Sequence, residues 1–137
     1  MAPGPIDPRI LAAVALGALP GAAARYAVVQ LITVPAGHFP WATFWTNVSG
    51  SLVLGFLLAL LIERYPPALY TRAFAGTGFL GAYTTFSTFS VEADLLVKDG
   101  HTAVALAYVV ASLAAGLMAS WWGILAGRRL VHERARP

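Results

Sequence analysis

The chain has 137 residues, of which 58% are hydrophobic and only 11% are charged, and its mean hydropathy is +0.71. This composition excludes an ordinary soluble domain and indicates a single membrane-embedded domain, while the absence of cysteine excludes disulfides and thiolate metal sites. The net charge of +3 does not indicate nucleic-acid binding, because the basic residues lie at the ends of apolar segments, where they suit lipid headgroups.

Four apolar segments follow one another along the chain, and each is long enough to cross a hydrocarbon core of about 30 Å. They extend over about residues 10–32, 42–62, 73–97 and 102–126. Short polar connections that contain proline or glycine separate them. We therefore predict an all-α membrane protein with four transmembrane helices in one domain over residues 1–137.

The first apolar segment has two interpretations. We expect a transmembrane helix, but Arg9, the apolar run from Ile10 and the small residues at 22–24 also imitate the three regions of a signal peptide. Cleavage there would leave three spans and a mature chain beginning at Arg25. Arg25 itself is unusual, because an arginine inside a span costs about 2.5 to 3.5 kcal/mol. It either snorkels to the headgroups, or it pins a backbone segment or attracts anions at the mouth of a cavity.

Polar side chains recur every four residues in two of the spans, so each set shares one helical face. The second span carries Thr43, Asn47 and Ser51 in this pattern, and the fourth carries Tyr108 and Ser112. Hydrogen bonds between packed helices explain the hydroxyl residues equally well. Asn47 points more strongly to a function, because its amide offers two N–H donors that suit an anion in a dry site.

The third span is the most unusual, because the glycines at 76, 78 and 81 precede a run of Ser and Thr residues over 84–90. Glycine weakens a helix, so we predict a break near the bilayer centre, at residues 81–84. Backbone carbonyls freed at that depth commonly bind a cation. Phe86 and Phe89 are ordinarily core residues, but the positive edges of their rings also suit a small anion that passes along the span.

Three stretches together resemble the Fluc/CrcB family of bacterial fluoride channels. They are GAAARY at 21–26, TNVSGS at 46–51 and GAYTTFSTFSVE at 81–92, in the order and spacing of that family. The resemblance implies a multi-pass protein of the bacterial cell membrane that exports fluoride from the cytoplasm by passive diffusion. It also implies an antiparallel dimer of four-helix subunits and no enzymatic activity.

The resemblance further implies roles for particular residues. A fluoride ion would lose its water and gain hydrogen bonds along one pathway, where its small size would be the filter. The family's pore residues correspond to Asn47, Phe86 and Phe89 and, less closely, to Tyr108 and Ser112. Hydroxyls such as those of Ser87 or Thr88 would donate to the ion beside them. Glu92 corresponds to an acid near the end of the pore.

A structural sodium ion at the dimer centre is also implied. By motif position, the backbone carbonyls of Gly81 and Thr84 of each subunit would hold it. Members of the family often have paired glycines before the break, whereas this chain has Leu80, Gly81 and Ala82. The cation site should survive this difference, because carbonyls rather than side chains would form it.

The distribution of Lys and Arg conflicts with simple dual topology. On the side of the membrane that holds both termini, the basic residues are Arg9, Arg64, Arg72, Arg128, Arg129, Arg134 and Arg136. On the opposite side there is only Lys98, joined by Arg25 if its side chain reaches the surface. The positive-inside rule therefore predicts both termini inside the cell. Either an antiparallel homodimer or a heterodimer with an oppositely oriented homologue is compatible with the resemblance, and the asymmetry favours the heterodimer.

Two other functions compete with a fluoride channel. A small four-span proton-coupled multidrug exporter has a similar size and also forms dimers, but it needs a membrane-embedded carboxylate for proton exchange. Glu92 is the only candidate, and it lies toward the end of its span. A membrane assembly protein that transports nothing would explain the small residues in the spans, but not Asn47 together with a broken helix.

Overall fold

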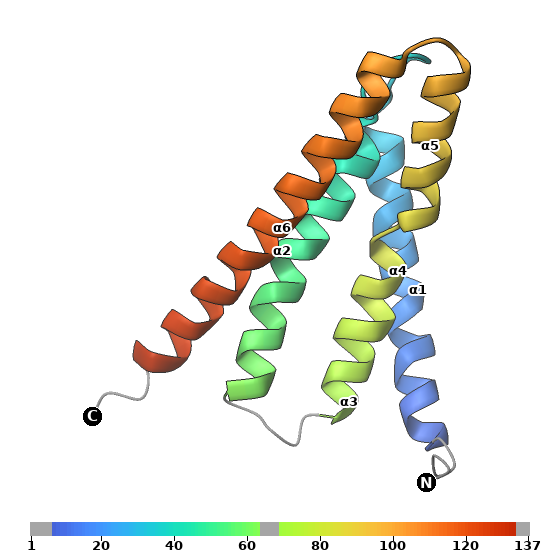
Figure 1. The fold of residues 1–137 in the computed structure, drawn as a ribbon. Helices are drawn as coiled ribbons and strands as arrows, with labels where there is room; N and C mark the ends of the chain where they lie inside the picture. Colours follow the sequence, from blue (N-terminus) through green and yellow to red (C-terminus); the bar gives the residue numbers. More distant parts are fainter. Residues whose placement is uncertain (1–6, 64–68, 134–137) are drawn as a thin grey trace, which may run out of the picture.

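The computed structural model describes residues 7–63 and 69–133. In chain order its helices are α1 (Pro8–Leu31), α2 (Trp41–Glu63), α3 (Leu69–Thr71), the π-helix η1 (Arg72–Leu80), α4 (Gly81–Tyr83), α5 (Phe86–Lys98) and α6 (Thr102–Glu133). They form four rods, because α3, η1, α4 and α5 follow one another in a single series. Figure 1 shows the start of α1 and the end of α6 at the same end of the bundle. The predicted all-α architecture with a broken third helix is confirmed.

Three of the four rods are continuous helices that are long and apolar enough to cross a membrane, namely Pro8–Leu31, Trp41–Leu61 and Thr102–His132. The remaining rod is assembled from α3, η1, α4 and α5. In α1, the Asp7 side chain accepts a hydrogen bond from the backbone N–H of Arg9, and Pro8 occupies the first turn, so the helix has a strong start signal. It packs along η1 and α4 as an integral part of the bundle.

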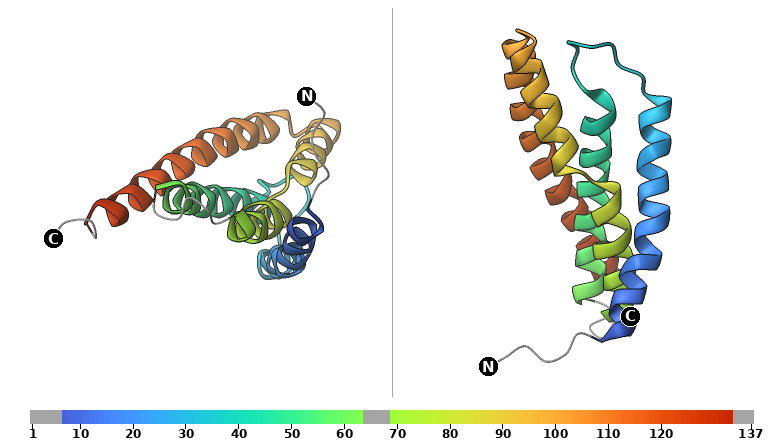
Figure 2. Two further views of the ribbon diagram at one scale, coloured as in Figure 1. Left: turned by 90° about the horizontal axis from the view of Figure 1, so that it is seen from below. Right: turned by 90° about the vertical axis from the view of Figure 1, so that its right-hand side faces the viewer.

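Glycines bring the helices together in two closely packed pairs. In α2 and α6, a Cβ atom on Gly55 would lie 2.3 Å from the Ser120 carbonyl oxygen, and one on Gly123 would lie 2.1 Å from that of Leu52. Gly17 and Gly21 of α1 approach the backbone of η1 in the same way. Small residues of this kind let membrane helices approach closely. In Figure 2, α1 and α6 lie on opposite sides of the molecule.

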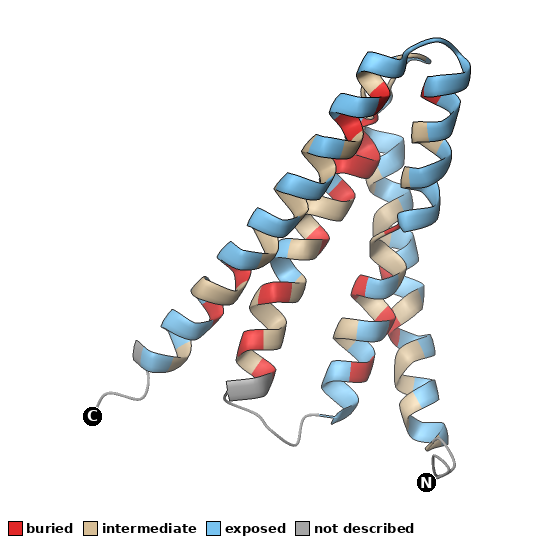
Figure 3. Ribbon diagram, in the orientation of Figure 1, coloured by how far each residue is buried: buried red, intermediate tan, exposed pale blue. Residues whose placement is uncertain are grey.

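Most of the buried side chains lie on α2 or at the contact between α5 and α6. One cluster, which we call the aromatic cluster, joins Phe44, Leu96, Ala105 and Tyr108, with Phe39 and Phe89 packed against it. Elsewhere the helices expose large apolar side chains, and Figure 3 shows α1 and α5 as mostly exposed. Exposed apolar surface on this scale suits lipid or a partner chain rather than water.

The break in the third rod lies at Thr84 and Thr85, slightly later than predicted. Gly81 is helical, with φ −65° and ψ −32°, and α4 continues to Tyr83. Helical hydrogen bonding continues as far as Thr84, whose N–H and hydroxyl both donate to the Leu80 carbonyl, at 3.0 and 2.9 Å. The expectation of unwinding from Gly81 was therefore wrong: glycine lowers the cost of a break but does not place it. Thr84 and Thr85 are extended, with ψ 158° and 121°.

Candidate functional site

Asn47 of α2 fixes the break by binding both polar groups of one backbone residue. The Thr85 N–H donates to Asn47 Oδ1 at 2.8 Å, and Asn47 Nδ2 donates to the Thr85 carbonyl at 2.9 Å. This pairing satisfies backbone that lipid cannot satisfy. Asn47 is only half-buried, and its amide nitrogen keeps a second N–H beyond the one that binds Thr85.

The same geometry redirects two backbone N–H groups away from helical carbonyls. In an unbroken helix, the Thr85 N–H would donate to Gly81, but here it binds Asn47. The Thr88 N–H would donate to Thr84, but here it binds Thr85 Oγ1 at 3.2 Å. The carbonyls of Gly81 and Thr84 thus lose their usual donors. Carbonyls without a helical donor suit a hard cation such as sodium, so this donor set is compatible with the ion that the resemblance implies.

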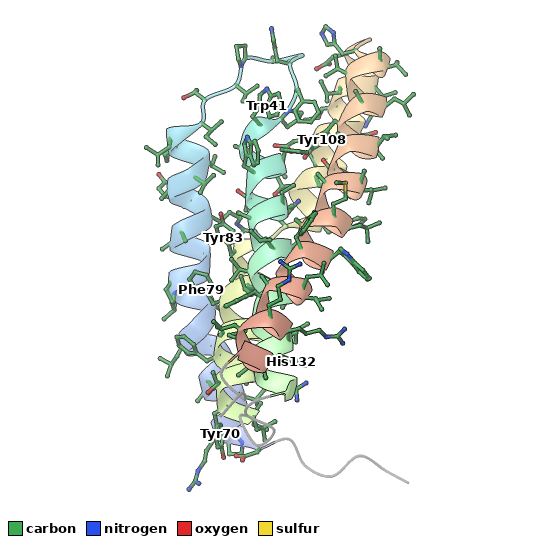
Figure 4. The ribbon with its side chains drawn as sticks, turned by 90° about the vertical axis from the view of Figure 1, so that its left-hand side faces the viewer. Trp41, Tyr70, Phe79, Tyr83, Tyr108 and His132 are labelled. Carbon is green, nitrogen blue, oxygen red and sulfur yellow. The ribbon has the colours of Figure 1, made fainter. Side chains whose placement is uncertain are left out.

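The first turn of α5 presents polar and aromatic groups outward from the break. Thr85 Oγ1 caps this turn and lies 3.0 Å from Thr88 Oγ1 and 3.3 Å from Ser87 Oγ. Phe86 is 78% exposed, and its ring centroid lies 5.8 Å from that of Phe89. The structure therefore brings Ser87, Thr88 and both phenylalanines to one end of α5, beside the break. Figure 4 shows Tyr83, which precedes the break, near the middle of the bundle.

Glu92 of α5 joins three helices through its carboxylate. Thr43 of α2 donates to Oε1 at 2.9 Å, and the hydroxyl of Tyr108 in α6 donates to Oε2 at 2.8 Å. Both donors are buried, and Tyr108 has no exposed surface. The sequence placed Thr43 in a polar stripe but did not assign it to the site, because its spacing gives no sign of a partner 49 residues away.

Ser112 lies one turn beyond Tyr108 on α6, and the structure does not join it to Glu92. Its hydroxyl oxygen is buried, and no hydrogen-bond partner lies near it in the part of the chain that the structure describes. A buried hydroxyl without a partner is costly, so it calls for an explanation such as an ion or a water molecule.

Arg25 lines a cavity of about 470 Å³ together with threonines from α2, the break and α5. Thr43, Thr46, Thr85 and Thr88 contribute to its walls. Arg25 is half-buried and lines this cavity beside the break. A guanidinium group there favours an anion in the cavity by Coulomb attraction.

A second cavity, of about 490 Å³, lies under the loop between α1 and α2 and is also lined by Glu92 and Asp99. Thr43 lines the first cavity and Glu92 the second, and a single hydrogen bond of 2.9 Å joins these two residues. The polar groups around Glu92 therefore lie between two hollows at different depths of the bundle.

The chain is similar to known membrane proteins over most of its length. Residues 12–124 match the family described as CrcB-like protein, Camphor Resistance (CrcB). The chain is 48% identical over 127 residues to Fluoride-specific ion channel FluC 3 of Streptomyces avermitilis, covering 93% of this chain and 62% of that protein. It is 43% identical over 125 residues to FluC 1 of Streptomyces coelicolor, covering 91% and 81%. The match to FluC 1 of Mycobacterium tuberculosis is 40% over 128 residues, covering 93% and 97%.

Proposed function

We propose that this chain, which belongs to the CrcB-like family, is a fluoride-selective ion channel through which fluoride leaves the cytoplasm by passive diffusion. It is a multi-pass membrane protein of that family, with three continuous spans and a broken one. The relatives named above are fluoride channels, which supports this function over a multidrug exporter. The observation that carries the proposal is the break held open by Asn47, with hydrogen-bond donors on both sides of it.

Fluoride would exchange its hydration shell for hydrogen bonds from the protein. Donors with remaining capacity are the second N–H of Asn47, the hydroxyl of Thr88, which accepts from Thr85 Oγ1, and the hydroxyl of Ser112, which has no partner among the described residues. The hydroxyl of Ser87, 3.3 Å from Thr85 Oγ1, would turn from Thr85 to the ion. The ring edges of Phe86 and Phe89 would face the ion, and Tyr108 would line the pathway further along. A larger halide fits a dry constriction poorly and recovers less of its hydration energy, so size would set the selectivity.

The active unit would be an antiparallel pair with a structural sodium ion at its centre. One chain supplies the carbonyls of Gly81 and Thr84, and two oxygens alone do not replace the hydration shell of a cation. A second copy, or an oppositely oriented homologue, would supply the remaining carbonyls. When bound, sodium would contribute positive charge that holds the two breaks together.

Fluoride efflux from liposomes, followed with a fluoride electrode, tests the function. The protein is purified from cells that express it alone or together with an oppositely oriented homologue. We expect rapid fluoride efflux and no measurable chloride efflux from at least one preparation. Absence of fluoride efflux from both would contradict the proposal.

Two variants test the pathway in the same assay. Asn47→Asp removes the N–H donors and places a carboxylate beside the Thr85 carbonyl, so we expect efflux to fall at least about tenfold. Its control is Gln30→Glu, the same amide-to-acid change on the exposed end of α1. Phe86→Ile should also slow efflux, whereas Phe74→Ile, at an exposed phenylalanine of η1, should not. Equal rates in each variant and its control would show that the pathway is assigned wrongly.

A further inference from the structure

Phe39, in the loop between α1 and α2, packs against the buried ring of Tyr108. The two ring centroids are 5.3 Å apart and the ring planes meet at 81°, an edge-to-face arrangement. On another side of Tyr108, the Phe89 ring lies at 5.1 Å. Tyr108 thus packs against both Phe39, a loop residue outside the proposed site, and Phe89, a residue of the proposed pathway. Figure 4 shows Tyr108 at the same end of the bundle as this loop.

The loop holds Phe39 in a defined position. Gly37 has a positive φ of 78°, and a Cβ atom there would lie 2.4 Å from Nε2 of His101, so the imidazole ring packs directly on the glycine. The carbonyl of Phe39 accepts a hydrogen bond of 2.8 Å from the N–H of Trp41. The Phe39 ring also contacts the rings of Trp41 and Phe44, at 4.5 and 5.4 Å. The loop is therefore fastened to both the start of α2 and the turn before α6.

We propose that Phe39 is a positioning residue for the anion pathway. It fixes the Tyr108 ring so that the hydroxyl stays on Glu92 Oε2 and the ring stays packed against Phe89. Phe39 acts through Tyr108 and needs no contact with the ion. The inference rests on the proposed function, because it takes Tyr108 and Phe89 as lining the fluoride pathway.

Loss of the Phe39 ring would remove the edge contact and leave space into which Tyr108 tilts. We expect Phe39→Leu to slow fluoride efflux at least about fivefold and Phe39→Tyr, which keeps the ring, to restore at least about half of the wild-type rate. The matched control is Phe56→Leu, the same change at a half-buried phenylalanine of α2 that lies outside the aromatic cluster. It should lower thermal stability, because part of a packed ring is lost, but slow efflux less than about twofold.

A double-mutant cycle separates positioning from general loosening of the fold. Tyr108→Phe keeps the ring and removes the hydroxyl that binds Glu92. If Phe39 acts through that hydroxyl, Phe39→Leu in the Tyr108→Phe background should slow efflux by less than about twofold more. Phe39→Met takes the place of Phe39→Leu in the cycle if the leucine variant does not reconstitute.

The outcomes distinguish this inference from the function on which it rests. Wild-type protein that passes no fluoride overturns the proposed function. Wild-type protein that passes fluoride, with Phe39→Leu equally fast or with effects that multiply fully in the double variant, overturns the role of Phe39 alone.

Discussion

Thr85 combines three contacts that make a broken helix tolerable inside a membrane. Its N–H and carbonyl pair with Asn47, and its hydroxyl accepts the N–H of Thr88 at the first turn of α5. Each unsatisfied backbone group in hydrocarbon costs several kcal/mol, so a break without these partners would revert to helix. The break therefore lies where one residue finds partners for all of its polar groups, and not where glycine is most abundant.

Replacing Thr85 by valine tests the cap separately from the Asn47 pairing. Valine is β-branched like threonine and keeps the extended backbone, but it has no oxygen to accept the Thr88 N–H. Loss of an N-cap costs about 0.5 to 2 kcal/mol. We expect the unfolding temperature in detergent, followed by circular dichroism, to fall for Thr85→Val. Thr77→Val, at an exposed threonine of η1, is the control, and an equal fall in both variants would exclude a capping role.

At the scale of elements, close backbone contact between helices depends on particular glycines. A Cβ atom on Gly78 of η1 would lie 2.5 Å from the Val14 carbonyl oxygen and 3.0 Å from Cα of Gly17. Gly50 of α2 likewise leaves room for Thr84, whose Cγ2 would lie 2.3 Å from an added Cβ. The sequence suggested that glycines of the third span weaken its helix, whereas Gly78 serves mainly to pack η1 against α1.

Two glycines of η1 that are separated by one residue give a matched test of this packing. Gly78→Ala places a methyl group against backbone that has no flexible side chain to yield, so we expect a loss of about 1 to 3 kcal/mol. Among the described residues, no atom outside the adjoining backbone of its own helix lies within 4 Å of a Cβ added to Gly76, so Gly76→Ala should be neutral or stabilise by up to about 1 kcal/mol through helix propensity. Thermal unfolding in detergent measures both, and equal destabilisation would contradict the packing role of Gly78.

The sequence is sufficient to predict the spans but not the contacts between them. Hydropathy is a local property, so all four rods and the polar faces of α2 and α6 follow from composition and period. The break depends on Asn47, which lies 38 residues from Thr85, and the carboxylate network joins Thr43 to a residue 49 positions away. Such pairings depend on how the helices pack, which one sequence does not specify. The role of Phe39 escaped prediction for the same reason, because it depends on packing against Tyr108 of a distant helix.

For the whole molecule, the distribution of charge and of exposed apolar surface limits how the chain sits in a membrane. In α1 the only buried residues are Gly17 and Gly21, so most of this helix faces lipid or a partner. Arg9, Arg72 and the Arg128–Arg129 pair lie at the end of the bundle where α1 begins. At the opposite end, Lys98 is paired with Asp94 at 2.7 Å, which raises the pKa of Lys98 and offsets its charge. Arg64, Arg134 and Arg136 lie outside the described residues.

This asymmetry predicts one orientation when the chain is expressed alone, with α1 beginning inside the cell. Because the chain has no cysteine, single cysteines report orientation cleanly. We expect Asp99→Cys to react with a membrane-impermeant maleimide in intact cells, and His132→Cys to react only after permeabilisation. Fluoride resistance of such cells should then require an oppositely oriented homologue.

Adding positive charge to the opposite end should weaken the orientation bias. In the Asp99→Cys and His132→Cys backgrounds, Thr33→Lys with Ala36→Lys places two lysines in the exposed loop between α1 and α2, and we expect part of each cysteine population to change its accessibility. Glutamine at the same positions is the control, because it is polar but uncharged. If the unaltered distribution of charge already gives both orientations and fluoride resistance without a homologue, the active unit is an antiparallel homodimer, and the charge asymmetry does not select a partner.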